Sequence, residues 1–245
     1  MAAVGGIFRY PIKSLAAEAL TSADLAAGRC VAGDRAYAIA HAGCEYNESS
    51  GAWASKRSFL NRRDCPGLAR LEARFVDGAV VLRLDGRSVT ARPGESSDAL
   101  TTLLDGIVGK RYQRPFRLVS ANAPLTDEPE EVLSILNMAS LAELSEAVGA
   151  PLEQQRFSGN LWLDGLDAWS EFDLVGRSIR VGDACLRVVE PIARCAAINV
   201  MPGTGDTTPN VLKGLVAKFG HENFGIFATV EAAGRIAMGD QVILQ

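Results

Sequence analysis

The sequence predicts a mainly β protein with some α (α+β), organised as two β-barrel-type subdomains decorated with short helices. Three observations lead to this fold class. Short apolar runs recur along the whole chain, turn-forming Gly and Asp residues separate them, and only three modest segments have the character of a helix. Many short strands joined by tight turns are typical of sheets that close into barrels. We therefore expect barrel-like sheets with a few helices on their outside.

The strands are predicted from these apolar runs. Those within 71–92 are the best defined, because Asp77-Gly78 and Asp85-Gly86 provide the positive-φ residues that a two-residue hairpin turn needs. The other predicted strands are 6–10, 19–25, 36–41, 53–59, 116–120, 156–163, a pair flanking Gly182-Asp183, 224–230 and 241–244.

The helices are predicted from the signals at their ends. Ser97 and Asn210 are candidate N-caps, and Gly149 follows a segment whose leucines share one helical face. These signals predict helices at 98–108, 140–148 and 210–219. A polar, proline-bearing segment at 122–131 marks a change of composition. We therefore divide the chain into a domain at 1–120 and a domain at 121–245.

The composition excludes several classes of function. The chain has 245 residues, a net charge of −4 and no apolar run near the roughly 20 residues that span a bilayer. Its N-terminus lacks a basic start followed by a long apolar segment, so it predicts no secretory signal. We expect a cytoplasmic protein that binds neither nucleic acid nor membrane.

The cysteines form no metal or disulfide signature. The chain has five, with no CxxC pair among them. His41 and Cys44 have a spacing that can seat two metal ligands, but no second pair accompanies them. We therefore expect no iron–sulfur site, and any redox reaction must take its electrons from another protein.

One cysteine has a distinctive setting, in the segment PIARCAAINVMPGTGD at 191–206. Cys195 directly follows Arg194 at the end of a predicted strand and precedes an irregular loop. A neighbouring guanidinium favours the thiolate, which is the form that acts as a nucleophile or binds a soft metal. The alternative is a free cysteine packed as a small hydrophobic residue.

An ordered set of short motifs extends over nearly the whole chain. These are YPIKS at 10–14, GDR at 33–35, a helix opening with Ser140, RFSGN at 156–160, ARC at 193–195, TG at 204–205, FG at 224–225 and MGDQV at 238–242. The set resembles proteins with a molybdenum cofactor sulfurase C-terminal (MOSC) domain preceded by a MOSC N-terminal β-barrel domain. The amidoxime-reducing components are similar proteins of this group.

The resemblance implies a molybdenum cofactor (Mo-molybdopterin) and names its site. Cys195 matches the family cysteine that ligates molybdenum, and no pyridoxal phosphate is expected. The residues that match family cofactor contacts are Lys13, Ser14, Arg35, Ser140, Arg156, Asn160, Arg194 and Cys195. Cations and hydroxyls of these types suit the phosphate and the edges of a pterin.

The sequence departs from the family pattern R-F-R-P-N at one point. Ser158 stands where the pattern has its second arginine. Residues two apart on a strand share a face, so we expect Arg156, Ser158 and Asn160 to point the same way. Arg156 would then partly replace the missing charge.

Each residue also has a plainer interpretation. Lys13 and Arg35 can be solvated charges, Asn160 a turn residue and Ser140 only a helix cap. The loop PGTGD at 202–206 lacks the features of a phosphate loop and is interpreted as shaping the pocket. The sequence leaves open whether Glu171 and Asp173 donate protons or face water.

The resemblance implies an oxidoreductase that reduces small N-hydroxylated substrates, such as amidoximes and hydroxylamines. Its electrons would come from a separate iron–sulfur or flavin protein, because this sequence shows no module of that kind. The alternative is a non-catalytic carrier of molybdenum cofactor, or of sulfur as a Cys195 persulfide, that works with cofactor-biosynthesis proteins. A barrel protein that has lost the cofactor is a third interpretation.

Overall fold

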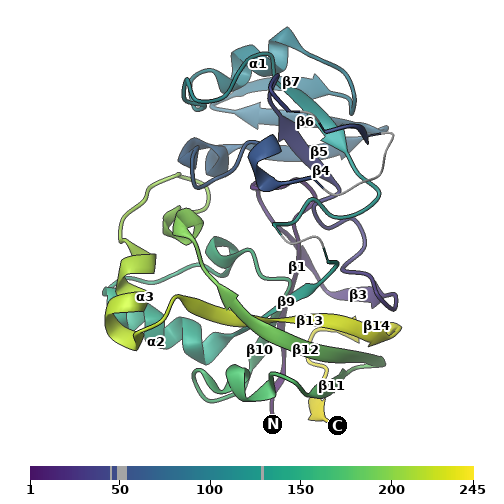
Figure 1. Cartoon of the computed structure of the whole chain (residues 1–245), viewed down its shortest axis with the longest axis vertical. Coiled ribbons are helices and arrows are strands. Elements are labelled where there is room, and N and C mark those ends of the chain that lie inside the picture. Colours follow the sequence, from purple (N-terminus) through teal and green to yellow (C-terminus); the bar gives the residue numbers. More distant parts are fainter. Residues whose placement is uncertain (45, 49–53, 128–129) are drawn as a thin grey trace.

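The largest sheet of the molecule curls into a half-barrel (Figure 1). The computed structural model describes residues 1–44, 46–48, 54–127 and 130–245. The sheet has the strand order β15-β11-β12-β13-β9-β10-β1-β2, and only its β9–β10 pair is parallel. Its strands are β1 (Ala3–Arg9), β2 (Glu18–Leu20), β9 (Leu133–Asn137), β10 (Leu161–Asp164), β11 (Ser178–Val181), β12 (Ala184–Ala193), β13 (Asn223–Ala232) and β15 (Val242–Leu244).

Backbone hydrogen bonds bring the two ends of this sheet together. The N–H of Val4 donates to the carbonyl of Asp240 (2.9 Å), and the N–H of Val242 donates to the carbonyl of Ala2 (2.9 Å). These bonds join the start of β1 to the residues around the start of β15. A separate ladder of β3 (Ser22–Leu25) with β14 (Gly234–Ala237) also links the two ends of the chain. Closure of this kind removes exposed sheet edges.

The other lobe, here called the upper lobe, lies above the half-barrel in Figure 1. Its strands and its helix lie between residues 37 and 120. It holds a two-stranded ladder and a three-stranded meander, with one short helix packed beside them. Its elements are β4 (Tyr37–Ala40), β5 (Glu72–Val76), β6 (Ala79–Leu84), β7 (Arg87–Ala91), β8 (Arg117–Ser120) and α1 (Asp98–Leu104). Asp77 and Gly78 both have positive φ (47° and 73°), as a tight hairpin turn requires.

The helices begin and end where their capping residues lie. Ser97 caps α1 by accepting from the N–H of Leu100, and Asn210 caps α3 (Val211–Phe219) by accepting from Lys213. The helix α2 (Met138–Val148) begins two residues before Ser140, because Asn137 is its N-cap, and ends at left-handed Gly149. In the residues that the structure describes, these are the three α-helices; η2–η6 are short 3₁₀ turns.

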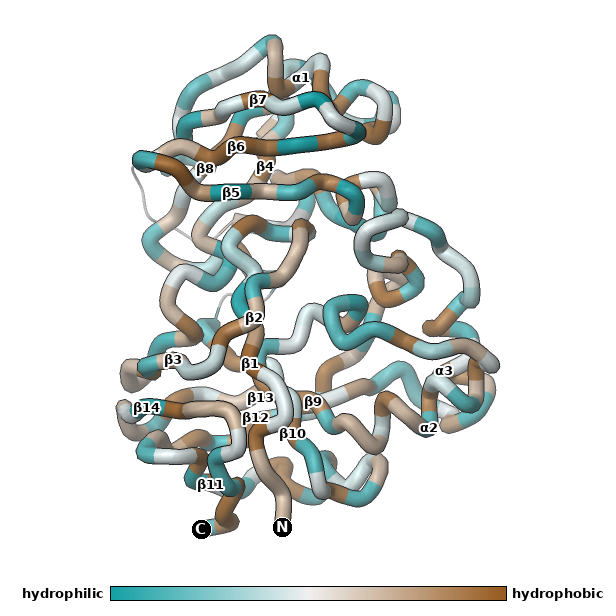
Figure 2. The backbone as a smooth tube through the Cα atoms, turned by 180° about the vertical axis from the view of Figure 1, so that it is seen from behind, coloured by the Kyte–Doolittle hydropathy of each residue, from teal (hydrophilic) through white to brown (hydrophobic). Residues whose placement is uncertain are grey.

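Each lobe has its own apolar core. One core fills the upper lobe with residues from 12 to 118, and a second lies on the inner face of the half-barrel. A third packs α2 and α3 against the outer face through residues such as Trp162 and Phe224. Figure 2, which views the molecule from behind, shows hydrophobic stretches in the strands of both lobes.

The mainly β fold with short helices is confirmed, and so are most of the elements. The meander at 71–92 and the helices near 140–148 and 210–219 are present, whereas α1 ends four residues early, at Leu104. The strand β9 was not predicted from the sequence, although its five residues are all buried.

Two of the predicted strands are wrong. In the segment 53–59, Trp53 lies outside the described residues, and the rest contains a 3₁₀ turn, η2 (Lys56–Ser58). In the segment 156–163, Arg156 ends the turn η4 (Gln154–Phe157) and Ser158 is left-handed, with φ 53°, so the strand begins only at Leu161. The expectation that residues 156, 158 and 160 share one strand face is therefore wrong.

The half-barrel also contains strands from before residue 120. The strands β1, β2 and β3 precede the upper lobe in the sequence but pair with strands of the half-barrel and with β14. The surface segment predicted at 122–131 includes residues 128 and 129, which lie outside the described residues. The domain limits at 1–120 and 121–245 remain a prediction.

Candidate functional site

A pocket of about 400 Å³ lies where segments of both lobes meet. It receives residues 61–63 from the upper lobe, and residues 156–160 and 190–198 from the half-barrel. Seven of the eight residues named from the sequence line it. They are Lys13, Ser14, Arg35, Arg156, Asn160, Arg194 and Cys195.

The lining is strongly cationic. Among the described residues that line it, six carry a positive charge and two a negative charge. The cations are Lys13, Arg35, Arg62, Arg63, Arg156 and Arg194, and the carboxylates are Asp127 and Glu190. A hollow with this excess of one charge attracts anions. The chain as a whole is acidic, with a net charge of −4, so the charge is local.

Arg35 is held in place by the segment around it. Its guanidinium pairs with buried Asp34, donates to the carbonyl of Ser158 (2.8 Å) and lies 4.8 Å above the ring of Tyr10. Asp34 in turn accepts from the backbone N–H of Tyr10 (2.7 Å). Burial alone would lower the pKa of Arg35, but the charge and hydrogen bond of Asp34 outweigh it and raise the pKa.

Lys13 is buried at the side of the pocket. Its Nζ donates to the carbonyl of Leu125 (2.8 Å) and to Asp127 Oδ1 (2.7 Å). Its positive charge therefore fixes the segment that leaves β8, and it also contributes to the field of the pocket.

Arg156 and Arg62 are buried guanidinium groups with unused donors. The side chain of Arg156 is fully buried, pairs with Glu153 and donates to the carbonyl of Asn199 (2.7 Å), but its Nη2 has no partner. Arg62 donates from Nη2 to Ser158 Oγ (2.7 Å), and its Nε has no partner. Buried donors in proteins usually have a hydrogen-bond partner, so these two nitrogens are unsatisfied donors in residues that line the pocket.

Arg194 and Cys195 directly follow β12 and have different surroundings. Cys195 is exposed at the pocket and is the N-cap of a 3₁₀ turn, η6 (Ala196–Asn199). Arg194 donates to the carbonyl of Phe157 (2.8 Å) and twice to the carbonyl of Phe224. Burial lowers the pKa of Arg194 to about 9, although the nearby Cys195 opposes this shift. Arg194 thus joins two segments of the site, while the exposed thiol of Cys195 opens onto the pocket.

Asn160 lines the pocket, but its side-chain amide forms hydrogen bonds with the protein itself. Its Oδ1 accepts from the hydroxyl (2.8 Å) and the N–H (3.2 Å) of Ser134, and its Nδ2 donates to the carbonyl of Phe8 (3.2 Å). The side chain is only 2% exposed. The amide holds β1, β9 and the approach to β10 in register around the pocket.

Ser140 lies outside the pocket. Its hydroxyl donates to the carboxylate of Glu171 (2.9 Å) and accepts from the N–H of Trp169 (2.8 Å). Both side chains are fully buried, and burial raises the pKa of Glu171. Glu171 therefore neither faces water nor reaches the pocket, and Ser140 serves the packing of α2 against the turn η5 (Ser170–Leu174).

The sequence reasoning did not identify Arg62 and Arg63 as pocket residues. They lie in the NRRD run at 61–64, just after buried Phe59 and Leu60. A pair of arginines directly after an apolar run was the available signal, but nothing in the local pattern says that this loop meets residues 156–160.

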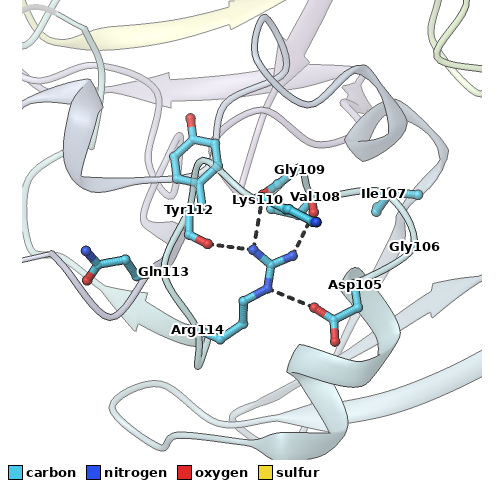
Figure 3. A pocket seen from close by; sticks show the side chains of 9 residues that line it. All are labelled: Asp105, Gly106, Ile107, Val108, Gly109, Lys110, Tyr112, Gln113 and Arg114. Atoms are coloured by element: carbon cyan, nitrogen blue, oxygen red, sulfur yellow. Dashed lines mark hydrogen bonds and ion pairs between the residues drawn. The ribbon is translucent and has the colours of Figure 1, made fainter.

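A larger hollow, of about 850 Å³, is lined by residues 105–114 of the upper lobe (Figure 3). Arg114 donates there to Asp105 and to the carbonyls of Val108, Gly109 and Tyr112. Its charge is thus used within the loop, and no cysteine or histidine is found among the described residues that line the hollow. We regard the smaller, cationic pocket as the functional site.

The described residues offer no cluster that would hold a metal ion through protein ligands alone. Within the described ranges, no three His, Cys, Asp or Glu residues gather closely enough to hold a metal ion. Among the described residues that line the pocket, Cys195 is the single thiol. Among the same residues, no helix is long and apolar enough to cross a bilayer.

Comparison with known proteins identifies the family. Residues 1–137 match the MOSC N-terminal beta barrel domain, and residues 122–243 match the MOSC domain. The chain belongs to the MOSC family. MOSC domains occur in molybdenum-cofactor-binding proteins, and some members are enzymes. No curated protein matches the chain.

One solved structure shares the fold over the whole of this chain. The YuaD protein of Bacillus subtilis is 14% identical with a TM-score of 0.51, and the match covers 100% of this chain and 96% of that one. YiiM of Geobacillus stearothermophilus is 20% identical with a TM-score of 0.38, covering 46% of this chain and 53% of that one. At such identities the likeness to YuaD supports the arrangement of the strands and nothing about the reaction.

Proposed function

We propose that this MOSC protein binds molybdenum cofactor and reduces small N-hydroxylated compounds with electrons from a separate iron–sulfur or flavin protein. One observation carries the proposal: an exposed thiol, Cys195, opens onto a pocket whose lining has an excess of cations. A thiolate is a suitable ligand for molybdenum, and the cations suit the phosphate of the pterin.

The residues fit the cofactor by their chemistry. Two buried guanidinium nitrogens, Arg62 Nε and Arg156 Nη2, lack partners, as expected beside a site that receives an anion. Cys195, Lys13, Arg35, Arg62 and Arg156 are the residues that would hold the cofactor. When bound, the cofactor would supply the two-electron redox chemistry that converts an N-hydroxylated compound, with two protons, into its reduced form and water.

The chain's own part is to bind, orient and admit protons. Arg35 is already fixed by Asp34 and Tyr10, so it loses little conformational freedom when an anion arrives. Arg194 holds the turn before Ser158 against β13 and thereby fixes this part of the pocket wall. Glu190 is an exposed carboxylate of the lining, and we assign to it the passing of protons to a substrate.

A carrier of sulfur or cofactor is the second candidate, and the exposure of Cys195 favours it equally. An accessible thiol with cationic neighbours can accept sulfane sulfur and hold a persulfide. Under this proposal the protein works with cofactor-biosynthesis proteins and turns over no substrate.

Reduction of benzamidoxime distinguishes the two candidates. The protein is purified from a host that makes molybdenum cofactor, and benzamidine formation is measured with a chemical electron donor. The enzyme proposal predicts turnover that is lost in Cys195→Ala and kept in Cys185→Ala, a half-exposed thiol outside the pocket. A molybdenum-loaded protein that forms no benzamidine but carries sulfane sulfur on Cys195 would favour the carrier.

A further inference from the structure

Arg62 is a buried cation without a counter-charge. Its side chain belongs to a residue only 6% exposed, and its Nη2 donates to Ser158 Oγ (2.7 Å) and to the carbonyl of Arg156 (3.3 Å). No carboxylate of the described residues lies within ion-pair distance of it. An uncompensated charge in the interior is strongly unfavourable, so a site of this kind calls for an anion.

The neighbouring cations already have their partners. Arg35 pairs with Asp34, and Arg156 pairs with Glu153. Arg35 and Arg156 both act on Arg62 as like charges; after burial itself, their repulsion adds to the lowering of its pKa. Around Ser158, three guanidinium groups are therefore matched by two carboxylates. Of these three, Arg62 is the one without a carboxylate, and it lies at the wall of the pocket. Arg194, a further lining guanidinium, bonds to the carbonyls of Phe157 and Phe224.

Ser158 is the point on which these groups converge. It is left-handed, with φ 53°, a conformation that is unfavourable for a residue other than glycine. Its carbonyl accepts from Arg35 Nη2 (2.8 Å), while its hydroxyl accepts from Arg62. The serine thus leaves room for a guanidinium that arrives from the other lobe, and it fixes one nitrogen of that guanidinium while Nε stays free.

We propose that Arg62, oriented by Ser158, forms a phosphate-binding subsite through which the upper lobe holds a phosphate monoester in the pocket. Guanidinium groups bind phosphate through parallel, charge-assisted hydrogen bonds. The identification of this phosphate with that of the pterin rests on the proposed function. The same subsite would also take free phosphate.

The loop after Cys195 fixes the segment that carries Arg62. The N–H of Gly203 donates to the carbonyl of Ala69 (2.9 Å), and Gly205 lies so close to Pro66 that an added Cβ would be 2.8 Å from its carbonyl oxygen. The residues 66–70 form the 3₁₀ turn that follows Arg62 in the sequence. These contacts fix the position of the phosphate subsite relative to the Cys195 thiol, although the two belong to different lobes.

The test is the binding of inorganic phosphate, measured by calorimetry and by thermal unfolding, to protein from a host that lacks molybdenum cofactor. We expect Arg62→Met to weaken phosphate binding about 10- to 100-fold, the usual effect of losing hydrogen bonds to a charged group. Arg62→Lys keeps the positive charge but not the parallel N–H donors of the guanidinium, so it should lose less phosphate affinity than Arg62→Met. Arg70→Met is the control, because Arg70 lies on the next turn and pairs with Asp85 outside the pocket.

A second readout separates binding from a structural role. Without phosphate, Arg62→Met should unfold at the same temperature as the parent or higher, because the surplus charge is removed. Equal phosphate affinity in parent and Arg62→Met, or no phosphate binding by the parent, would overturn the inference. If Arg62→Met does not fold, the phosphate affinity of Arg62→Lys is measured instead. An affinity equal to the parent's would count against the subsite.

Molybdenum content distinguishes failure of the proposed function from failure of the phosphate subsite. A parent that contains no molybdenum when made in a cofactor-producing host, but binds phosphate through Arg62, would leave the subsite standing for another phosphorylated ligand. The opposite outcome is a parent that contains molybdenum but binds phosphate equally well with and without Arg62. It would overturn the phosphate subsite and leave the proposed function standing.

Discussion

Cys30 makes stability depend on pH in the alkaline range. Burial, with the nearby carboxylates Asp34 and Glu131, raises the pKa of its thiol from 9.0 to about 12. Below pH 9 the thiol is protonated in both the folded and the unfolded chain. Above pH 9 only the unfolded chain loses this proton, so stability is lost as the pH rises towards 12.

The prediction is a difference in slope. Between about pH 9 and 11 the free energy of unfolding of the parent should fall by about 1.4 kcal/mol per pH unit more than that of Cys30→Ala. Urea unfolding at several pH values measures both slopes. Curves that stay parallel from pH 7 to 11 would show that the Cys30 thiol ionises equally in both states.

Ser140 matches a cofactor contact of the family motif, but in the structure it bonds to buried Glu171. In Ser140→Ala the buried carboxylate of Glu171 loses a hydrogen bond, so the free energy of unfolding should fall by about 1–3 kcal/mol. Because Ser140 does not line the pocket, the molybdenum content should stay at the parent's level. Lower molybdenum content with unchanged stability would return Ser140 to the cofactor site.

Among the elements, the loop at 202–206 is the contact between lobes that can be tested most sharply. Gly203 and Gly205 both have φ near +80°, but an added Cβ meets nothing at Gly203 and meets the carbonyl of Pro66 at Gly205. Gly203→Ala should cost about 1–2 kcal/mol of stability for the left-handed backbone alone. Gly205→Ala should cost about 1–3 kcal/mol more, because the loop must move away from Pro66.

Thermal or urea unfolding of the two glycine variants gives the comparison directly. Because the loop holds the turn after Arg62, Gly205→Ala should also weaken phosphate binding, whereas Gly203→Ala should not. Equal losses in both variants would mean that the loop does not press on the upper lobe.

Elements set by local chemistry were predictable, and those set by distant partners were not. The meander depends on two Asp-Gly turns, and α3 depends on its Asn210 cap, so the sequence pattern sufficed. Ser158 breaks the predicted strand because Arg35 and Arg62, about 100 residues away in the chain, both bind it. The pocket's thiol and most of its cations were named from the motifs, but Arg62 enters it only through tertiary folding.

At the scale of the whole molecule, the strands β1 and β2 belong physically to the half-barrel, although they precede the upper lobe in the sequence. The strand β1 lies between β10 and β2, so a fragment of residues 121–245 would expose the edge of β10 and open the closure near Asp240. We expect this fragment to lack a cooperative unfolding transition by circular dichroism. A cooperative transition with native-like far-ultraviolet ellipticity would show that the C-terminal part folds without β1.

The excess of cations around Cys195 is also a property of the whole molecule, because both lobes contribute to it. Its central consequence is the binding of molybdenum cofactor. The most direct measurement is the molybdenum and pterin content of protein from a cofactor-producing host, for the parent, Cys195→Ala and the control Cys185→Ala. We predict near-stoichiometric molybdenum and pterin in the parent and the control, and a marked loss of molybdenum in Cys195→Ala. A parent without molybdenum, in a host where another molybdoenzyme is loaded normally, would contradict the account.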